Sequence, residues 1–158
     1  LLIENYPNHN IFMLPQLFNV GSWRDYLFFV KLKEQNPDAP LILISDKYSS
    51  DIQQTIIAGA QCVIGARYHS IVFAINNGVP FVSLSYEHKM SGLLCSLGHE
   101  EMMVDITNIF VAPENTQAAI ELIRSRLKTI CWEPELRLKA QNMARICFDK
   151  FINNCFSI

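Results

Sequence analysis

The stretch GARYHSIVFAINNGVPFVSLSYEHK, residues 65–89, decides the fold of this chain. It holds two apolar runs, at 71–75 and 81–84, and Gly78-Val79-Pro80 separates them. The first run, within residues 68–77, has the length of a helix, whereas the second has the length of a buried strand. Arginine, histidine and lysine gather at the ends of these elements. The pattern is typical of helices and strands in alternation.

The same alternation extends on both sides of this stretch. Runs of strand length occur at four further places, namely Ile11–Leu14, Leu41–Ile44, Cys62–Ile64 and Met102–Ile106. Three further helices are predicted between these strands. The first follows Gly21-Ser22 and carries Trp23, Tyr26, Leu27 and Val30 at helical spacing. The second runs from Ser50-Asp51 to Gly59, and the third covers Lys89–Leu97 and ends at Gly98. Apolar strands separated by helices form a parallel sheet that helices cover on both sides. The sequence therefore predicts a three-layer α/β fold.

The C-terminal region is predicted to be helical. One helix opens at Pro113-Glu114-Asn115-Thr116, and Trp132–Pro134 interrupts it. A last helix follows over residues 134–154. Its apolar stripe is formed by Leu136, Ala140, Met143, Ala144, Cys147, Phe148 and Phe151. We expect this stripe to be a core or docking face.

Composition limits the kind of protein. The chain has 158 residues, half of them apolar, and a formal charge of −2 without a basic block. One globular domain is expected, and no nucleic acid or anionic membrane is expected as a partner. No apolar run approaches the roughly 20 residues that span a bilayer. The chain begins at Leu1 without an initiator Met, which suggests a fragment of a longer protein.

The cysteines indicate a reducing compartment. None of the five has CxxC spacing, and most fall on predicted apolar faces; they are Cys62, Cys95, Cys131, Cys147 and Cys155. We therefore expect reduced core thiols and a cytoplasmic protein.

The charged residues of the opening stretch fall where parallel α/β folds bind ligands. Ligands lie beyond the carboxyl ends of the strands, and Arg67 and His69 follow the third strand directly. Free N–H groups at the start of the next helix favour an anion there, and an arginine fork matches phosphate or carboxylate. Lys89 follows the fourth strand and could lie across the same crevice. The sequence predicts an anion site at two neighbouring strand ends.

Each of these residues also has an ordinary structural interpretation. An arginine at a helix start is often solvated or ion-paired, and a single histidine is often a hydrogen-bonded structural residue. His88 stands in a charged tripeptide and is expected to face solvent. Asp46-Lys47, after the second strand, is ordinary turn composition.

Other kinds of site lack their motifs. The four histidines show neither HExxH nor zinc spacing, so no metal site is predicted. The sequence has no GxGxxG or GxxxxGK[ST] loop and no GxSxG elbow. No cofactor is predicted.

Three ordered motifs resemble a known family. They are VIGARYHS at 63–70, NNGVP at 76–80 and YEHKMSG at 86–92, and together they resemble the C-terminal half of polysaccharide pyruvyl transferases. The resemblance covers roughly residues 10–130 and is strongest over 61–98. It implies a Rossmann-like domain that corresponds to the C-terminal half of a B-type glycosyltransferase fold.

The resemblance also implies a reaction. Such enzymes move the enolpyruvyl unit of phosphoenolpyruvate onto two hydroxyls of a sugar, forming a cyclic ketal and releasing phosphate. It places Arg67 and His69 in the RxH motif and Lys89 in the YxxK motif. We expect Arg67 to bind phosphate or carboxylate, His69 to protonate the methylene carbon or assist the phosphate, and Lys89 to neutralise the leaving phosphate. Ser85 and Tyr86 are weaker candidates for hydrogen bonds to the donor.

The domain interpretation follows from the same resemblance. Residues 1–9 are read as a linker remnant, 10–131 as the Rossmann-like donor-binding domain, and 132–158 as a C-terminal helix that packs back on this domain or on a missing N-terminal half. That half would supply acceptor contacts, so the fragment alone is expected to be inactive. Two alternatives stay open: a nucleotide-sugar-dependent glycosyltransferase half, with Glu87 on the ribose, and a non-catalytic interaction domain.

Overall fold

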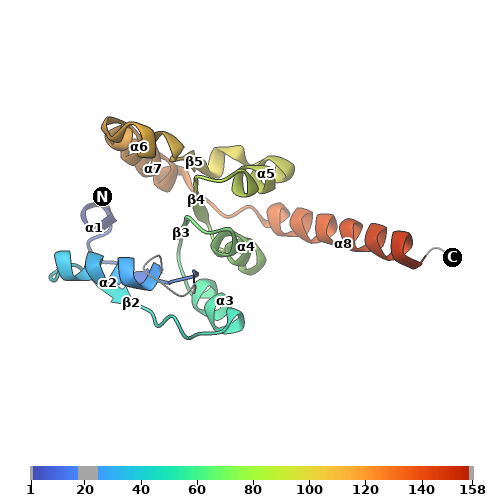
Figure 1. Cartoon of the computed structure of the whole chain (residues 1–158), viewed down its shortest axis with the longest axis horizontal. Coiled ribbons are helices and arrows are strands. Elements are labelled where there is room, and N and C mark those ends of the chain that lie inside the picture. The colour runs from blue at the N-terminus through green and yellow to red at the C-terminus, as the bar shows by residue number, and fades with distance from the viewer. Residues whose placement is uncertain (1, 18–24, 157–158) are drawn as a thin grey trace. The chain divides into compact units, whose positions relative to one another are not determined.

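The computed structural model describes residues 2–17 and 25–156, and they form a mixed α/β protein with parallel sheets (Figure 1). The chain divides into two compact units, Leu1–Ile56 and Ile57–Ile158. Residues 18–24, which include Trp23 and the predicted start of the first long helix, lie outside the described residues.

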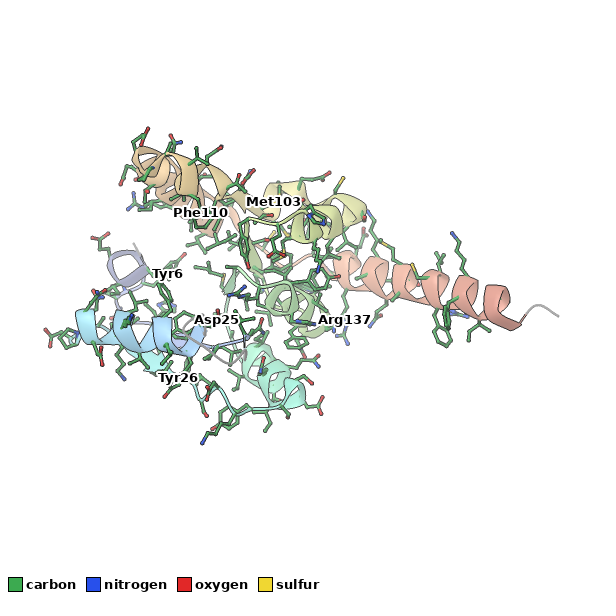
Figure 2. All side chains as sticks on the ribbon, viewed as in Figure 1. Tyr6, Asp25, Tyr26, Met103, Phe110 and Arg137 are labelled. Atoms are coloured by element: carbon green, nitrogen blue, oxygen red, sulfur yellow. The ribbon has the colours of Figure 1, made fainter. Side chains whose placement is uncertain are left out.

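The first unit holds a pair of strands. It contains α1 (Leu2–Asn5), β1 (Ile11–Met13), α2 (Asp25–Gln35), β2 (Leu41–Leu43) and most of α3 (Ser50–Ala58). β1 pairs with β2 in parallel, with Ile11 opposite Leu41. The Asp25 carboxylate, labelled in Figure 2, accepts hydrogen bonds from the backbone N–H groups of Gln16 and Leu17 at 3.1 and 3.0 Å. These bonds tie the segment after β1 to the start of α2.

The second unit holds a three-stranded parallel sheet in the order β3-β4-β5. Its elements are β3 (Val63–Gly65), α4 (Tyr68–Asn77), β4 (Phe81–Ser85), α5 (His88–Leu97), η1 (Glu100–Met102), β5 (Met103–Asp105), α6 (Thr107–Val111), η2 (Pro113–Asn115), α7 (Thr116–Thr129) and α8 (Pro134–Phe156). Gly65 and Met103 both stand opposite Ser83. β4 is therefore the central strand.

The core of this unit lies around β4. Phe81, Val82 and Val104 are fully buried on the strands, and Ile71 and Leu94 are fully buried on the helices that follow β3 and β4. Gly78 ends α4 with a φ of 72°, a left-handed conformation that glycine adopts without a steric penalty. The sequence Gly-Val-Pro thus stops α4 and starts β4 within three residues.

The predicted order of strands and helices is confirmed over the described residues. Within the first unit β1 pairs with β2, and within the second unit β3, β4 and β5 form one sheet; all these pairs are parallel, as the sequence predicts. The structure also has a short helix, α1, within the stretch predicted as a linker.

Helix α6 was not predicted. It has five residues, too few for a helical period to be visible, and its Phe110 and Val111 are exposed. Asp105 precedes it and accepts hydrogen bonds from the Thr107 backbone N–H and hydroxyl at 2.8 and 2.6 Å. A side-chain turn of this kind starts a helix without an apolar stripe.

The last helix is anchored at its start and exposed further along. Leu136 is fully buried, and the Lys139 ammonium donates a hydrogen bond to the Leu97 carbonyl at 2.5 Å. Of the predicted stripe, Phe148 and Phe151 are about 60% exposed (62% and 60%), and the distal part of α8 extends away from the sheet (Figure 1). Among residues 2–17 and 25–156, no helix has the length and apolar character of a membrane span.

The prediction that the cysteines are core thiols is wrong for three of them. Cys95, Cys131 and Cys147 are free and exposed, because each falls on the solvent side of its helix or in a connection. Cys62 is free and half-buried, and burial raises the pKa of its thiol to about 11. Cys155 lies outside the described side chains.

Candidate functional site

The predicted site residues come from two neighbouring turns. The β3–α4 turn carries Arg67 and leads to His69, and the β4–α5 turn carries Tyr86 and leads to Lys89. β3 and β4 pair in parallel, so both turns leave the sheet at its carboxyl edge. This is the placement that the sequence predicts.

The β3–α4 turn is tightly packed around Gly65. A Cβ atom at this position would lie 2.8 Å from Cδ1 of Ile71 and would collide with the Ser70 hydroxyl. The Ser70 hydroxyl in turn donates a hydrogen bond to the Arg67 carbonyl at 2.5 Å. Glycine is therefore required by the close approach of α4 to the end of β3, and this approach fixes the backbone of Arg67.

Arg67 is held toward the second turn. Its Nη1 donates a hydrogen bond to the Tyr86 hydroxyl at 2.6 Å, and its Cζ lies 6.0 Å from the centre of the Tyr86 ring. The side chain is half-buried, with extended backbone at the N-cap of α4. It forms no capping hydrogen bond to that helix. The guanidinium is thus positioned by a contact between the two turns, with helix N–H groups beside it.

His69 and Lys89 lie at the same edge with exposed side chains. His69 is in the first turn of α4, where its ring centre is 5.9 Å from those of Tyr68 and Phe73. Lys89 is in the first turn of α5, after the exposed His88. No hydrogen bond or ion pair joins His69 to Lys89 in the part of the chain that the structure describes. Both side chains are accessible to a ligand.

Ser85 is buried rather than presented on the surface. It is 5% exposed, and its hydroxyl donates a hydrogen bond to the Glu87 carbonyl at 3.2 Å. This bond shapes the β4–α5 turn. Ser85 also lines a pocket of about 140 Å³ beside that turn.

This pocket lies at the carboxyl ends of β4 and β5. Besides Ser85 it is lined by Glu87, Ser91, Met103, Asp105 and Thr107, with Tyr86 and His88 at its wall. Sequence analysis missed its β5 side. The same rule that identified Arg67 would have found it, because Asp105 is the last residue of β5 and Thr107 follows that strand of the same sheet.

The pocket carries negative charge. Hydrogen bonds from Thr107, first from its hydroxyl and then from its N–H, lower the pKa of the Asp105 carboxyl below its ordinary value of 3.8. Asp105 is therefore a carboxylate at neutral pH. The edge of the sheet has a cationic side at Arg67 and an acidic side at Asp105.

Another pocket, of about 90 Å³, lies near the start of β4 and contains none of the predicted site residues. Its lining includes Phe81, Arg126 and Glu133. Within the described residues, no group of three or more histidine, cysteine or acidic side chains is arranged to hold a metal ion.

Comparisons with known proteins support the motif-based resemblance. The sequence profile of the family described as "Polysaccharide pyruvyl transferase" matches residues 2–88, more than half of the chain. This range includes Arg67, His69, Ser85 and Tyr86 and ends one residue before Lys89. It also includes the stretch predicted as a linker remnant.

Among curated proteins, the chain is similar to the amylovoran biosynthesis protein AmsJ of Erwinia amylovora. The two are 33% identical over 67 residues, which is 42% of this chain and 16% of AmsJ. The match thus spans less than a fifth of that relative's length. No solved structure matches the chain.

Proposed function

Because the chain belongs to the polysaccharide pyruvyl transferase family, we propose that it binds phosphoenolpyruvate as the donor for pyruvyl transfer to a saccharide. One observation carries the proposal: Arg67, fixed by Gly65 packing and by the Tyr86 hydroxyl, stands at the carboxyl edge of the β3-β4-β5 sheet. Phosphoenolpyruvate has a phosphate and a carboxylate, and a planar guanidinium matches either group.

The helix starts support anion binding at the same place. Neither N-cap residue, Arg67 of α4 or Glu87 of α5, forms a side-chain capping bond within the described residues. The N–H groups of Ser70 and Met90 donate to the carbonyls of Arg67 and Glu87 at 3.1 and 3.3 Å, and the N–H groups that precede them at the two helix starts, together with the helix dipoles, favour a bound anion. Lys89 adds a second cation in the first turn of α5.

His69 is the residue for proton delivery. It stands two residues after Arg67 with an exposed imidazole, a side chain that transfers protons near neutral pH. In the proposed reaction, His69 gives a proton to C3 and C2 becomes electrophilic. One sugar hydroxyl then adds to C2 and its proton returns to His69, and a second hydroxyl displaces the phosphate, which takes up the proton of that hydroxyl. Arg67 and Lys89 stabilise the charge on the departing phosphate, which leaves as inorganic phosphate.

The chain would act as the donor-binding half of a B-type glycosyltransferase-like enzyme. The acceptor would then be held partly by an N-terminal half, onto which α8 packs. The exposed side chains of Leu138, Phe148 and Phe151 are consistent with such a covering surface. The free cysteines are consistent with a cytoplasmic enzyme.

One observation favours a second candidate function. Glu87 lines the pocket beside the β4–α5 turn, where a nucleotide-sugar-dependent glycosyltransferase would hold a ribose. In that case Arg67 and Lys89 would bind the diphosphate. Competition between uridine diphosphate and phosphoenolpyruvate separates the two donors.

The test is a titration of the ¹⁵N-labelled chain with phosphoenolpyruvate. We expect the amide signals of residues 65–70 and 85–92 to shift, and Arg67→Ala to remove the shifts. Arg145→Ala is the matched control, because Arg145 is an exposed arginine on α8. Unchanged spectra at millimolar phosphoenolpyruvate, or equal shifts in the Arg67→Ala variant, would contradict the proposal.

A further inference from the structure

The pocket of about 90 Å³ near the start of β4 lies at the opposite edge of the sheet from Arg67. Phe81, which lines this pocket, is the first residue of β4, whereas the turn that carries Tyr86 follows the last residue of the strand. Over a strand of this length, at about 3.3 Å per residue, the two edges are roughly 13 Å apart. A small ligand in this pocket would therefore not contact the proposed donor site.

The pocket contains an arginine that the rest of the chain does not pair. Arg126, in the last turn of α7, lines the pocket, and its Nε is buried without a hydrogen-bond partner in the described residues. Nor does an ion pair join Arg126 to a carboxylate within residues 2–17 and 25–156. Buried donors are nearly always paired, and a guanidinium pairs most strongly with an anion. The pocket therefore offers an unused site for a negative group.

Two carboxylates line the same pocket. Glu101 belongs to η1, and Glu133 directly precedes α8. Their nearest cationic partner is His99, whose Nδ1 lies 3.0 Å from Oε1 of Glu101 and whose Nε2 lies 3.8 Å from Oε2 of Glu133. Both glutamate side chains keep about half of their surface exposed, at 54% and 49%. They are therefore accessible to a positive group of a ligand.

Most of the remaining lining is apolar, and the pocket is small. Phe81 and Val82 are fully buried at the start of β4, and Met102 and Ile130 add apolar surface from η1 and from the end of α7. The volume of about 90 Å³ is far below the roughly 300 Å³ at which sites for drug-sized ligands begin. The pocket thus suits a small molecule with little apolar surface of its own.

Charge decides which small molecule fits. A phosphate or a simple carboxylate would satisfy Arg126, but the like charges of Glu101 and Glu133 oppose it. A simple ammonium would satisfy the glutamates and be opposed by Arg126. An α-amino acid carries a carboxylate and an ammonium on one carbon atom, so it offers each group of the pocket an opposite charge.

We infer that this pocket binds a small zwitterionic α-amino acid. Its carboxylate accepts hydrogen bonds from Arg126, its ammonium donates to Glu101 and Glu133, and its side chain contacts the apolar wall at Phe81 and Met102. The inference is independent of the proposed function, because the two sites lie at opposite edges of the sheet.

Cys131 provides the measurement, since its free, exposed thiol lines the pocket. The chain is treated with iodoacetamide in the presence of L-alanine, acetate or ethylamine, and modification of each cysteine is followed by mass spectrometry. If the Kd is about 1 mM, about 10 mM L-alanine fills roughly nine-tenths of the sites, and Cys131 should react about tenfold more slowly. Cys147, an exposed free thiol on α8, should react at an unchanged rate and is the internal control.

The variants separate the two kinds of charge. Arg126→Gln should remove the protection of Cys131, because a neutral amide replaces the guanidinium. Arg124→Gln is the matched control, since Arg124 lies on the same helix, pairs with Glu121 and does not line the pocket. If Arg126→Gln does not fold, Glu133→Gln tests the opposite charge and should weaken the protection.

Three results would overturn the inference: no protection of Cys131 by L-alanine, equal protection by acetate or by ethylamine, or protection that persists in Arg126→Gln. The acetate and ethylamine arms need no variant, so they test the zwitterion on the unchanged chain. None of these results bears on phosphoenolpyruvate shifts at residues 65–70, so either proposal can fail without the other.

Discussion

The β3–α4 and β4–α5 turns follow neighbouring parallel strands, yet one is packed and the other is hollow. At the first turn, Ser70 and Ile71 approach Gly65 so closely that a single added carbon would collide with them. At the second turn, Ser85, Glu87 and Asp105 surround a pocket of about 140 Å³. Two turns in equivalent positions, each after a parallel strand, thus differ in packing: one is filled by side chains and the other borders a pocket.

The difference places two unlike environments at one edge of the sheet. The packed turn fixes the backbone of Arg67, and its guanidinium is then held by Tyr86. The hollow turn instead leaves carboxylates and hydroxyls around open space. The packed turn thus fixes the position of a charge, which is what a binding or catalytic group requires.

The largest effect is expected from filling the packed turn. Gly65→Val should lower the free energy of unfolding by about 1–3 kcal/mol, because the new side chain overpacks the contact with Ile71 and Ser70. Urea unfolding followed by circular dichroism measures this change.

Gly92→Ala is the matched control for that variant. Gly92 lies inside α5, and a Cβ atom there meets no atom within 4 Å. This variant should gain about 0.5–1 kcal/mol, since alanine favours helix. Equal changes at the two glycines would remove the distinction between packed and open space.

The contact between the turns should give a measurable coupling. A double-mutant cycle of Arg67→Ala and Tyr86→Phe removes the 2.6 Å hydrogen bond, and we expect a coupling energy of about 0.5–1.5 kcal/mol in urea unfolding. Arg145→Ala with Tyr86→Phe should be additive within about 0.5 kcal/mol. A zero coupling for the first pair would show that Tyr86 does not hold Arg67.

Two serines of β4 should respond with opposite signs. Ser83→Ala removes a buried hydroxyl without a partner in the described residues, so stability should rise by up to about 1 kcal/mol. Ser85→Ala removes the hydrogen bond to the Glu87 carbonyl, so stability should fall by about 0.5–1 kcal/mol. Thermal unfolding of the two variants is the measurement. A loss of stability in Ser83→Ala would mean that its hydroxyl is satisfied in solution.

The smallest expected effect is the pH dependence of stability that Asp105 causes. The pKa of Asp105 is lower in the folded chain than its ordinary value of 3.8. The Asp105 carboxylate therefore makes its full contribution to the free energy of unfolding above pH 3.8. This contribution is lost as the pH falls through the lowered pKa. Because Asp105 is exposed, the loss should be about 0.5 kcal/mol or less. Unfolding at several acidic pH values should show it in the wild type and not in Asp105→Asn.

Much of the second unit was predictable because its signals are local. Glycines mark the ends of elements: Gly65 ends β3, Gly78 ends α4 and Gly98 ends α5. The predicted helix over residues 68–77 is the observed α4. Because ligands of parallel α/β folds bind beyond the carboxyl ends of the strands, the sequence alone placed Arg67 and Lys89 at the ligand-binding edge of the predicted sheet. Asp105 escaped notice because the predicted strand ran from Met102 to Ile106, which placed Asp105 inside it, whereas β5 ends at Asp105.

The predicted stripe on the last helix had a different outcome. Its period is correct, and α8 spans Pro134–Phe156. The period did not distinguish buried Leu136 from exposed Phe148 and Phe151, because amphipathicity specifies a face and not the surface that covers it. Exposed Cys147, which belongs to this stripe, was misjudged for the same reason.

The sequence by itself determined the order of strands and helices, the sheet edge at which the candidate site residues lie and the family to which the chain belongs. These depend on neighbours along the chain, such as a glycine after a helix or an arginine after a strand. Only the tertiary structure decided that Tyr86 holds Arg67 and that Asp105 faces a pocket. Those features depend on contacts between residues far apart in sequence, which are set by packing and not by periodicity.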